Sequence, residues 1–201
     1  MIDFLTVLIA VVSLVILAVP GYILTKTKLL SSKAESAFST VVLYGAQPVM
    51  VLMGFQGEKF SSSIGVNILL TAGITTLVHV LMAIIVILAI RNKGDSSKAR
   101  VVRYASMFSN CGFMGFPFLQ IVFNGNPLRD EVMIYGAVVV SIFNIISWTL
   151  GVFLITGDKK NVSIKKIITN PTIIAVVLGF IFFFTIKVPF VQLAPSGSKL
   201  S

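Results

Sequence analysis

The most regular feature of the chain is the alternation of long apolar segments with short polar connections. Six segments are long enough to cross a bilayer core of roughly 30 Å, which requires about 20 helical residues. They are Phe4–Thr25, Ala34–Phe55, Val66–Ile90, Val101–Phe123, Val132–Thr156 and Pro171–Val188. The pattern predicts six membrane-spanning helices, here numbered in chain order, with no soluble domain between them.

Composition supports this prediction. Hydrophobic residues make up 56% of the 201 residues, charged residues make up 11%, and the mean hydropathy is +1.00. A soluble domain of this size could not bury so much apolar surface. We therefore expect an all-α polytopic membrane protein. Span 1 is expected to be retained, because Lys26 and Lys28 follow it rather than the small residues of a signal-cleavage site.

The net charge of +9 is unevenly distributed between the connections. Connections one, three and five carry most of the basic residues: Lys26, Lys28, Lys33, Arg91, Lys93, Lys98, Arg100, Arg103, Lys159, Lys160, Lys165 and Lys166. The other side carries Lys59, Arg129, Lys187 and Lys199. The positive-inside rule then places both termini outside and the basic connections in the cytoplasm. The charge is a topology signal, and we expect no nucleic-acid partner.

Span 4 contains residues that are poor material for a continuous helix. Its centre consists of Ser109, Asn110, Cys111, Gly112, Phe113, Met114, Gly115, Phe116 and Pro117. The half from Val101 to Asn110 would be about 15 Å long, so the break would fall near the bilayer midplane. In hydrocarbon, a helix break is tolerated only where the freed backbone groups are buried in protein or line a cavity. The pattern therefore predicts a binding site, with a simple proline kink as the alternative.

The second half of span 4 is expected to begin near Pro117, because proline suits the first position of a helix. The N–H groups of Phe118 and Leu119 would then point toward the midplane, where a helix N-terminus favours anions. Gly112 and Gly115 would permit close approach of a ligand or a crossing helix. Asn110 could donate and accept hydrogen bonds beside the break.

Other polar residues at membrane depth are candidates for the same site. Gln47 and Pro48 in span 2 would present a second polar surface to the cavity, or else form a kinked helix. Tyr135 and Asn144 lie in span 5, where Asn144 would contact the ligand or hydrogen-bond a neighbouring helix. His79 in span 3 is ionisable at membrane depth, which indicates either proton coupling or a neutral imidazole bonded within the bundle.

Enzymatic chemistry finds no support in the chain. All seven carboxylates lie at span ends or in connections: Asp3, Glu35, Glu58, Asp95, Asp130, Glu131 and Asp158. Patterns such as Gly-x-Ser-x-Gly and His-Glu-x-x-His are absent from the sequence. Cys111 and Trp148 are interpreted as packing residues. We expect no enzyme activity, no cofactor and no metal.

The chain resembles the auxin efflux carrier family, in its bacterial permease branch, over nearly all of its length. The resemblance rests on residues 109–117, on Pro48, and on Asn170–Gly179 at the start of span 6. It implies a fold of ten helices in two inverted repeats, with two broken helices crossing at the substrate site. Residues 1–157 would be the first five-helix repeat, including the broken helix 101–123. Residues 158–201 would be a connection, the first helix of the second repeat and a short tail.

The resemblance also implies a function. We expect a secondary active permease, or a fragment of one with six of ten helices, for small organic anions such as malate, malonate or auxin-like carboxylates. It would be a multi-pass protein of the cell membrane, specifically a bacterial inner membrane, and would form a homodimer in the lipid bilayer. The alternative is a non-transporting subunit or remnant that acts only with a partner copy.

Overall fold

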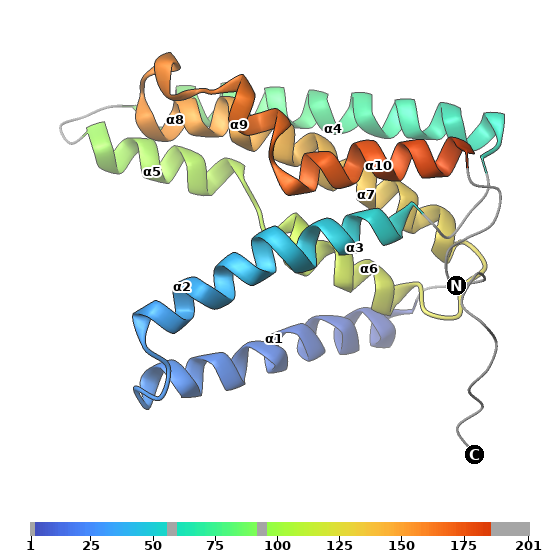
Figure 1. Ribbon diagram of the computed structural model, residues 1–201, viewed down its shortest axis with the longest axis horizontal. Helices are drawn as coiled ribbons and strands as arrows, with labels where there is room; N and C mark the ends of the chain where they lie inside the picture. Colours follow the sequence, from blue (N-terminus) through green and yellow to red (C-terminus); the bar gives the residue numbers. More distant parts are fainter. Residues whose placement is uncertain (1–2, 56–59, 92–95, 186–201) are drawn as a thin grey trace.

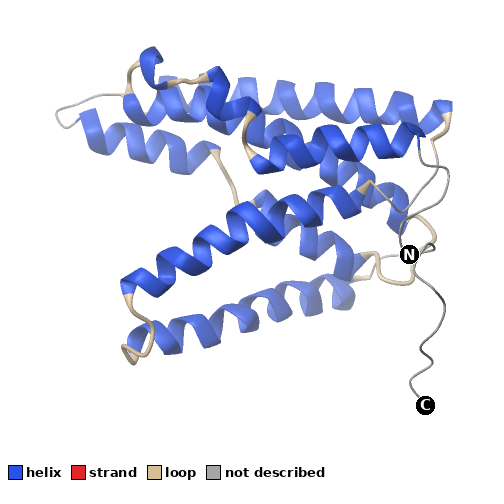
Figure 2. Ribbon diagram, viewed as in Figure 1, coloured by secondary structure: helices blue, strands red, loops and turns tan. Residues whose placement is uncertain are grey.

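The computed structural model describes residues 3–55, 60–91 and 96–185, and in these ranges every regular element is a helix (Figures 1 and 2). Four segments are long and apolar enough to cross a membrane: Phe4–Lys26, Lys33–Gly54, Ser62–Ala89 and Arg129–Thr156. Pro171–Thr185 is a shorter apolar helix. The expected all-α polytopic membrane protein is confirmed. The predicted end of span 6, the tail, Glu58, Lys59, Lys93 and Asp95 lie outside the described residues.

The elements follow one another with short connections. The first part of the chain forms α1 (Phe4–Lys26), α2 (Ser32–Val41), η1 (Val42–Ala46), α3 (Gln47–Gly54), α4 (Ser62–Ala89) and α5 (Ser96–Met107). The second part forms η2 (Cys111–Gly115), α6 (Phe116–Val122), α7 (Arg129–Ile146), η3 (Ser147–Gly151), α8 (Val152–Thr156), η4 (Lys159–Asn161), α9 (Ile164–Ile168) and α10 (Pro171–Thr185). The segments α2–η1–α3 and α7–η3–α8 each run as one continuous helix (Figure 1).

Side chains close the ends of these helices. Asp3, Ser31 and Ser61 each accept a hydrogen bond from the backbone N–H three residues later, which caps α1, α2 and α4. At the other end of α4, the Arg103 guanidinium donates to the carbonyl of Ile90 through Nε at 3.0 Å and Nη2 at 2.7 Å. Span 4 was predicted to begin at Val101, but its first helix, α5, already begins at Ser96.

Span 4 is broken, as predicted. The helix α5 ends at Met107, and the chain becomes helical again only at Cys111. On one side of the break, α5 packs against α4 and α8. On the other side, α6 packs against α1 and α7, so the two halves of the span belong to different parts of the bundle (Figure 1).

Two separate packing cores lie on the two sides of this break. The larger core joins α3, α4, α6, α7 and α10 around Phe55, Phe116 and Ile134, which are at most 1% exposed. The smaller core joins α4, α5 and α8 through Ala83, Met107 and Leu154. The break at residues 108–110 therefore connects two packed bodies rather than passing through one.

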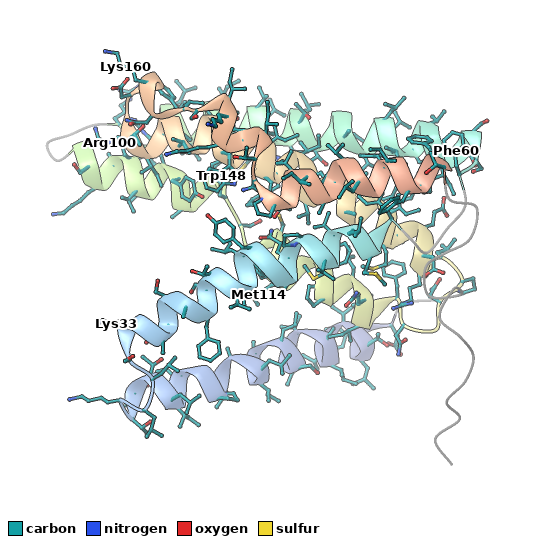
Figure 3. The ribbon with its side chains drawn as sticks, viewed as in Figure 1. Lys33, Phe60, Arg100, Met114, Trp148 and Lys160 are labelled. Atoms are coloured by element: carbon teal, nitrogen blue, oxygen red, sulfur yellow. The ribbon has the colours of Figure 1, made fainter. Side chains whose placement is uncertain are left out.

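One end of the molecule carries most of the basic residues. Figure 3 shows Lys33, Arg100 and Lys160 at this end and Phe60 at the opposite end. Among the described residues, Arg129, the first residue of α7, is the basic side chain at the opposite end. We call the end that carries Lys33, Arg100 and Lys160 the basic end.

Candidate functional site

Spans 2 and 4 each contain a widened helical turn directly before a proline. The N–H of Gln47 donates to the carbonyl of Val42, and the N–H of Phe116 donates to the carbonyl of Cys111, five residues back in both cases. Pro48 and Pro117 follow immediately. Proline has no N–H, and its ring clashes with the carbonyl four residues earlier. A π turn moves that carbonyl aside, so both spans accommodate their proline by the same means.

This geometry corrects the predicted start of the second half of span 4. The carbonyl of Asn110 accepts the N–H groups of Met114 at 3.1 Å and Gly115 at 3.2 Å, so the helix begins at Cys111. Pro117 lies within that helix. The prediction that Phe118 and Leu119 present free N–H groups is therefore wrong, because the N-terminal turn comes six residues before Pro117.

Gln47 lies against the backbone of the break. Its side chain is 6% exposed, and a Cβ atom added to Gly112 would come within 2.9 Å of Gln47 Nε2. A side chain at position 112 would displace this amide. Among the described residues, no side chain or backbone group hydrogen-bonds the Gln47 amide. The amide is not among the fully buried, unpartnered atoms of the described residues, so its polar atoms face the adjoining cavity, where a ligand or water can bond to them.

Gln47 opens into a cavity of about 330 Å³, which we call the central cavity. It is lined by Leu43, Gln47, Tyr104, Phe113, Phe143, Asn144, Ser147, Trp148, Val152, Ile155 and Thr156. The Tyr104 and Ser147 hydroxyls are 3.1 Å apart and hydrogen-bonded. The lining combines aromatic rings with neutral amides and hydroxyls and contains no charged side chain. Such a site binds a small ligand through dipoles and ring contacts.

Asn144 supplies the second amide of the central cavity. It is 7% exposed, and its Nδ2 donates to the carbonyl of Val140 at 2.7 Å, within its own helix. Its Oδ1 has no donor among the described residues. The amide therefore keeps one acceptor for a ligand or water.

The predicted site residues are divided between two cavities. Cys111, Gly115 and Tyr135 line a second, apolar cavity of about 350 Å³ between α6 and α7. The Tyr135 hydroxyl donates to Glu131 Oε1 at 2.6 Å and accepts from Asn67 Nδ2 at 3.0 Å. A Cβ atom at Gly115 would meet only Cys111 Cβ, at an ordinary 3.7 Å. Within the described residues, no group approaches Gly115 as closely as Gln47 approaches Gly112.

The remaining predicted residues line neither cavity. Ser109 and Asn110 are exposed in the break, while Pro48 and Pro117 are half-buried in the turns described above. His79 Nδ1 lies 2.7 Å from the carbonyl of Thr75, which can only accept, so Nδ1 carries the proton. The imidazole ring lies 6.3 Å from the ring of Phe108 and 5.9 Å from that of Phe143. His79 is thus bonded within the bundle, beside the break.

Sequence reasoning identified Gln47 and Asn144 and missed most of the central cavity. Trp148 was interpreted as packing, and Tyr104, Phe113, Phe143 and Ser147 were not singled out. A usable signal was present, because Asn144, Ser147 and Trp148 are spaced three and four residues apart and share one helix face. Tyr104 could not be found this way, since it comes from α5 on the other side of the break.

Comparison with known proteins gives one finding. A family model described as "Membrane transport protein" matches residues 6–193. No curated protein and no solved structure matches the chain. The matched range includes both halves of span 4 and every residue that lines the central cavity.

Proposed function

The chain belongs to the auxin efflux carrier family of membrane transport proteins, and from this premise we propose that it carries small organic anions through the central cavity. The anions are carboxylates such as malate, malonate or auxin-like acids. The observation that carries the proposal is the amide of Gln47, which lies beside the break in span 4, makes no hydrogen bond to a described residue and lines the central cavity. A carboxylate oxygen would accept the hydrogen bonds that this amide lacks.

The electrostatics of the central cavity support an anionic ligand. No carboxylate lines the cavity, so nothing there repels an acid. The N-terminal turn at Cys111–Gly115 lies against Gln47 and adds the positive end of its dipole. The Tyr104–Ser147 pair offers further hydroxyl groups. A membrane potential of 100 mV supplies about 2.3 kcal/mol per charge, which is enough to drive anion efflux.

The larger architecture follows the family. We propose that residues 1–157 form the first five-helix repeat, that 158–201 begin the second, and that the protein forms a homodimer in the cell membrane with the basic end in the cytoplasm. The side chains Ser109, Asn110 and Pro117 are proposed to complete the substrate site at the crossing. His79 is proposed for proton coupling, because its ring lies beside Phe108 at the break.

A second candidate function is a subunit that acts only with a partner copy. The observation that favours it is the exposure of α1. Only 6% of its 18 most apolar consecutive residues are buried. Phe4 is 81% exposed and Leu17 is 72% exposed. Cross-linking in native membranes tests this candidate, and recovery of monomer alone would count against it.

The test of anion binding uses Gln47→Leu. We expect malate or malonate to raise the melting temperature of the purified wild-type chain, because ligand binding stabilises the native state. Leucine is close to glutamine in size, so the variant should fold and melt close to wild type without ligand. It should also lose the ligand-induced rise and the uptake of labelled acid into vesicles.

The matched control is Gln120→Leu, which removes an exposed amide from span 4. It should leave both the ligand-free melting temperature and the ligand-induced rise unchanged. A full ligand-induced rise in Gln47→Leu would show that the acid binds elsewhere and would overturn the proposed site.

A further inference from the structure

A third cavity of about 270 Å³ lies next to the central cavity at the basic end. It is lined by Trp148, Val152, Thr156, Asn161, Ser163 and Lys166. We call it the outer cavity. Three of these residues, Trp148, Val152 and Thr156, also line the central cavity, so the two cavities share a wall. Figure 3 places Trp148 inward of Arg100 and Lys160, which mark the basic end.

The outer cavity differs from the central cavity in charge. Lys166 brings an ammonium group to it, and Asn161 and Ser163 add polar atoms. Lys166 forms no ion pair with a described residue. The neighbouring carboxylate of Asp158 does not line the cavity and accepts the backbone N–H of Lys160 at 2.9 Å. The ammonium group of Lys166 therefore has no carboxylate of the described residues to neutralise it.

Trp148 carries a further donor at the shared wall. Its side chain is 36% exposed, and its indole N–H makes no hydrogen bond to a described residue. Such an N–H can only donate, so it suits an acceptor such as a carboxylate oxygen. An oxyanion in the outer cavity would contact the Lys166 ammonium group on one side and the Trp148 indole N–H on the wall toward the central cavity.

We propose that the outer cavity is an entry site for organic carboxylates at the basic end, with Lys166 binding the carboxylate and Trp148 forming the wall to the central cavity. This inference rests on the proposed function. A cation in a concave site raises the local concentration of anions and their rate of entry. The neutral central cavity then binds the same anion weakly enough to release it, as a transport pathway requires.

The sequence offers an internal probe, because Trp148 is the only tryptophan. The experiment titrates the full 201-residue chain in phosphatidylcholine vesicles with malonate and with malate, following tryptophan fluorescence. We expect a saturable change in wild type. Lys166→Gln should weaken the apparent affinity by about fivefold, as for the loss of a partly exposed charge pair. Lys166→Arg should retain it.

Lys165→Gln is the matched control, because it removes the adjacent charge of α9 and does not line the cavity. It should bind both acids as wild type does. Equal affinities in Lys166→Gln, Lys165→Gln and wild type would overturn the entry site. So would the absence of any saturable response in wild type.

Uptake of labelled malonate separates this inference from the proposed function. If wild type and Lys166→Gln take up the acid with the same concentration dependence, the proposed transport function is supported and the entry site is wrong. If the Lys166-dependent fluorescence change occurs without uptake, anion binding in the outer cavity is supported and the proposed function is wrong.

A phospholipid headgroup presents similar oxyanion chemistry to Lys166, so the titration is repeated in vesicles that contain phosphatidylglycerol. We expect the response to malonate to persist, with somewhat weaker affinity through competition. If phosphatidylglycerol alone changes Trp148 fluorescence through Lys166, and neither acid does, the cavity binds lipid and the proposal is wrong.

Discussion

At the scale of single residues, the contact between Gly112 and Gln47 determines the geometry of the central cavity. The contact joins the break in span 4 to the π turn of span 2, and it leaves no space for a Cβ atom. Gly115, three residues later in the same turn, has no comparable contact. The two glycines of one motif therefore have different roles, and substitution separates them.

We expect Gly112→Ala to lower the melting temperature and the rate of anion uptake together. The new methyl group would force the Gln47 amide away, and such overpacking costs about 1–3 kcal/mol. Uptake should fall as well, because the displaced amide would no longer hold its place in the central cavity. Gly115→Ala is the control and should match wild type. Equal uptake by both variants would show that the contact has no role in transport.

Asp3 gives a pH-dependent prediction at the start of α1. Hydrogen bonds from Thr6, from its side chain first and its backbone N–H second, hold the pKa of Asp3 below its usual 3.8. Because the folded pKa is lowered, the cap stabilises the helix above pH 3.8 and is lost as the pH falls through the lower, folded value. A carbon-13 carboxyl titration should give a midpoint below 3.8. Thr6→Val should move that midpoint upward, and an unchanged midpoint would contradict this account.

At the scale of elements, the π turns before Pro48 and Pro117 explain how spans 2 and 4 keep a proline at membrane depth. Each turn contains one more residue than an α-helical turn, so it rotates the residues before it relative to those after it. In span 4 this rotation places Cys111 in the apolar cavity and Phe113 in the central cavity. The proline maintains that arrangement.

We expect Pro117→Ala to let η2 relax toward an α-helix, because the alanine N–H can donate to the carbonyl of Phe113. The relaxation would rotate Cys111 by about 100° relative to α6. Cys111 is the only cysteine, so its rate of maleimide labelling should change severalfold and uptake should fall. Pro20→Ala, within α1, should leave the labelling rate unchanged. An unaltered rate in Pro117→Ala would show that η2 does not depend on the proline.

The break shows how far sequence reasoning could go at this scale. Asn110, Gly112 and Pro117 in one apolar span predicted an interrupted helix, and the structure confirms the interruption. The predicted helix start near Pro117 was wrong, because the helix tolerates an internal proline through a π turn, and no single residue type encodes that turn. The contact between Gln47 and Gly112 was also out of reach, since it depends on which face of span 2 packs against span 4.

At the scale of the whole molecule, the basic end distinguishes the two surfaces of the membrane. Charge counting along the sequence predicted this asymmetry, because the side of each connection follows from the number of spans before it. The division into two packing cores could not be predicted in this way. It depends on α5 and α6 packing against different helices, which hydropathy does not record.

Accessibility to a membrane-impermeant thiol reagent tests the topology. In a Cys111→Ser background, we expect Asn124→Cys to be labelled in right-side-out vesicles, because the turn at Asn124 lies at the end opposite the basic end. Lys33→Cys should be labelled only after the vesicles are permeabilised, as the positive-inside rule requires. The reverse pattern would place the basic end outside the cell.

The packing of α1 against α6 has a consequence for biogenesis. About 90 residues of chain separate Lys26 from Phe116, so the first helix leaves the ribosome long before the helix that it packs against. At 5–20 residues per second, the delay is roughly 5–20 s. During this interval lipid must occupy the place of α6. The composition of α1, with Asp3 before it and Lys26 at its end, allows it to remain stable in the bilayer until its partner is synthesised.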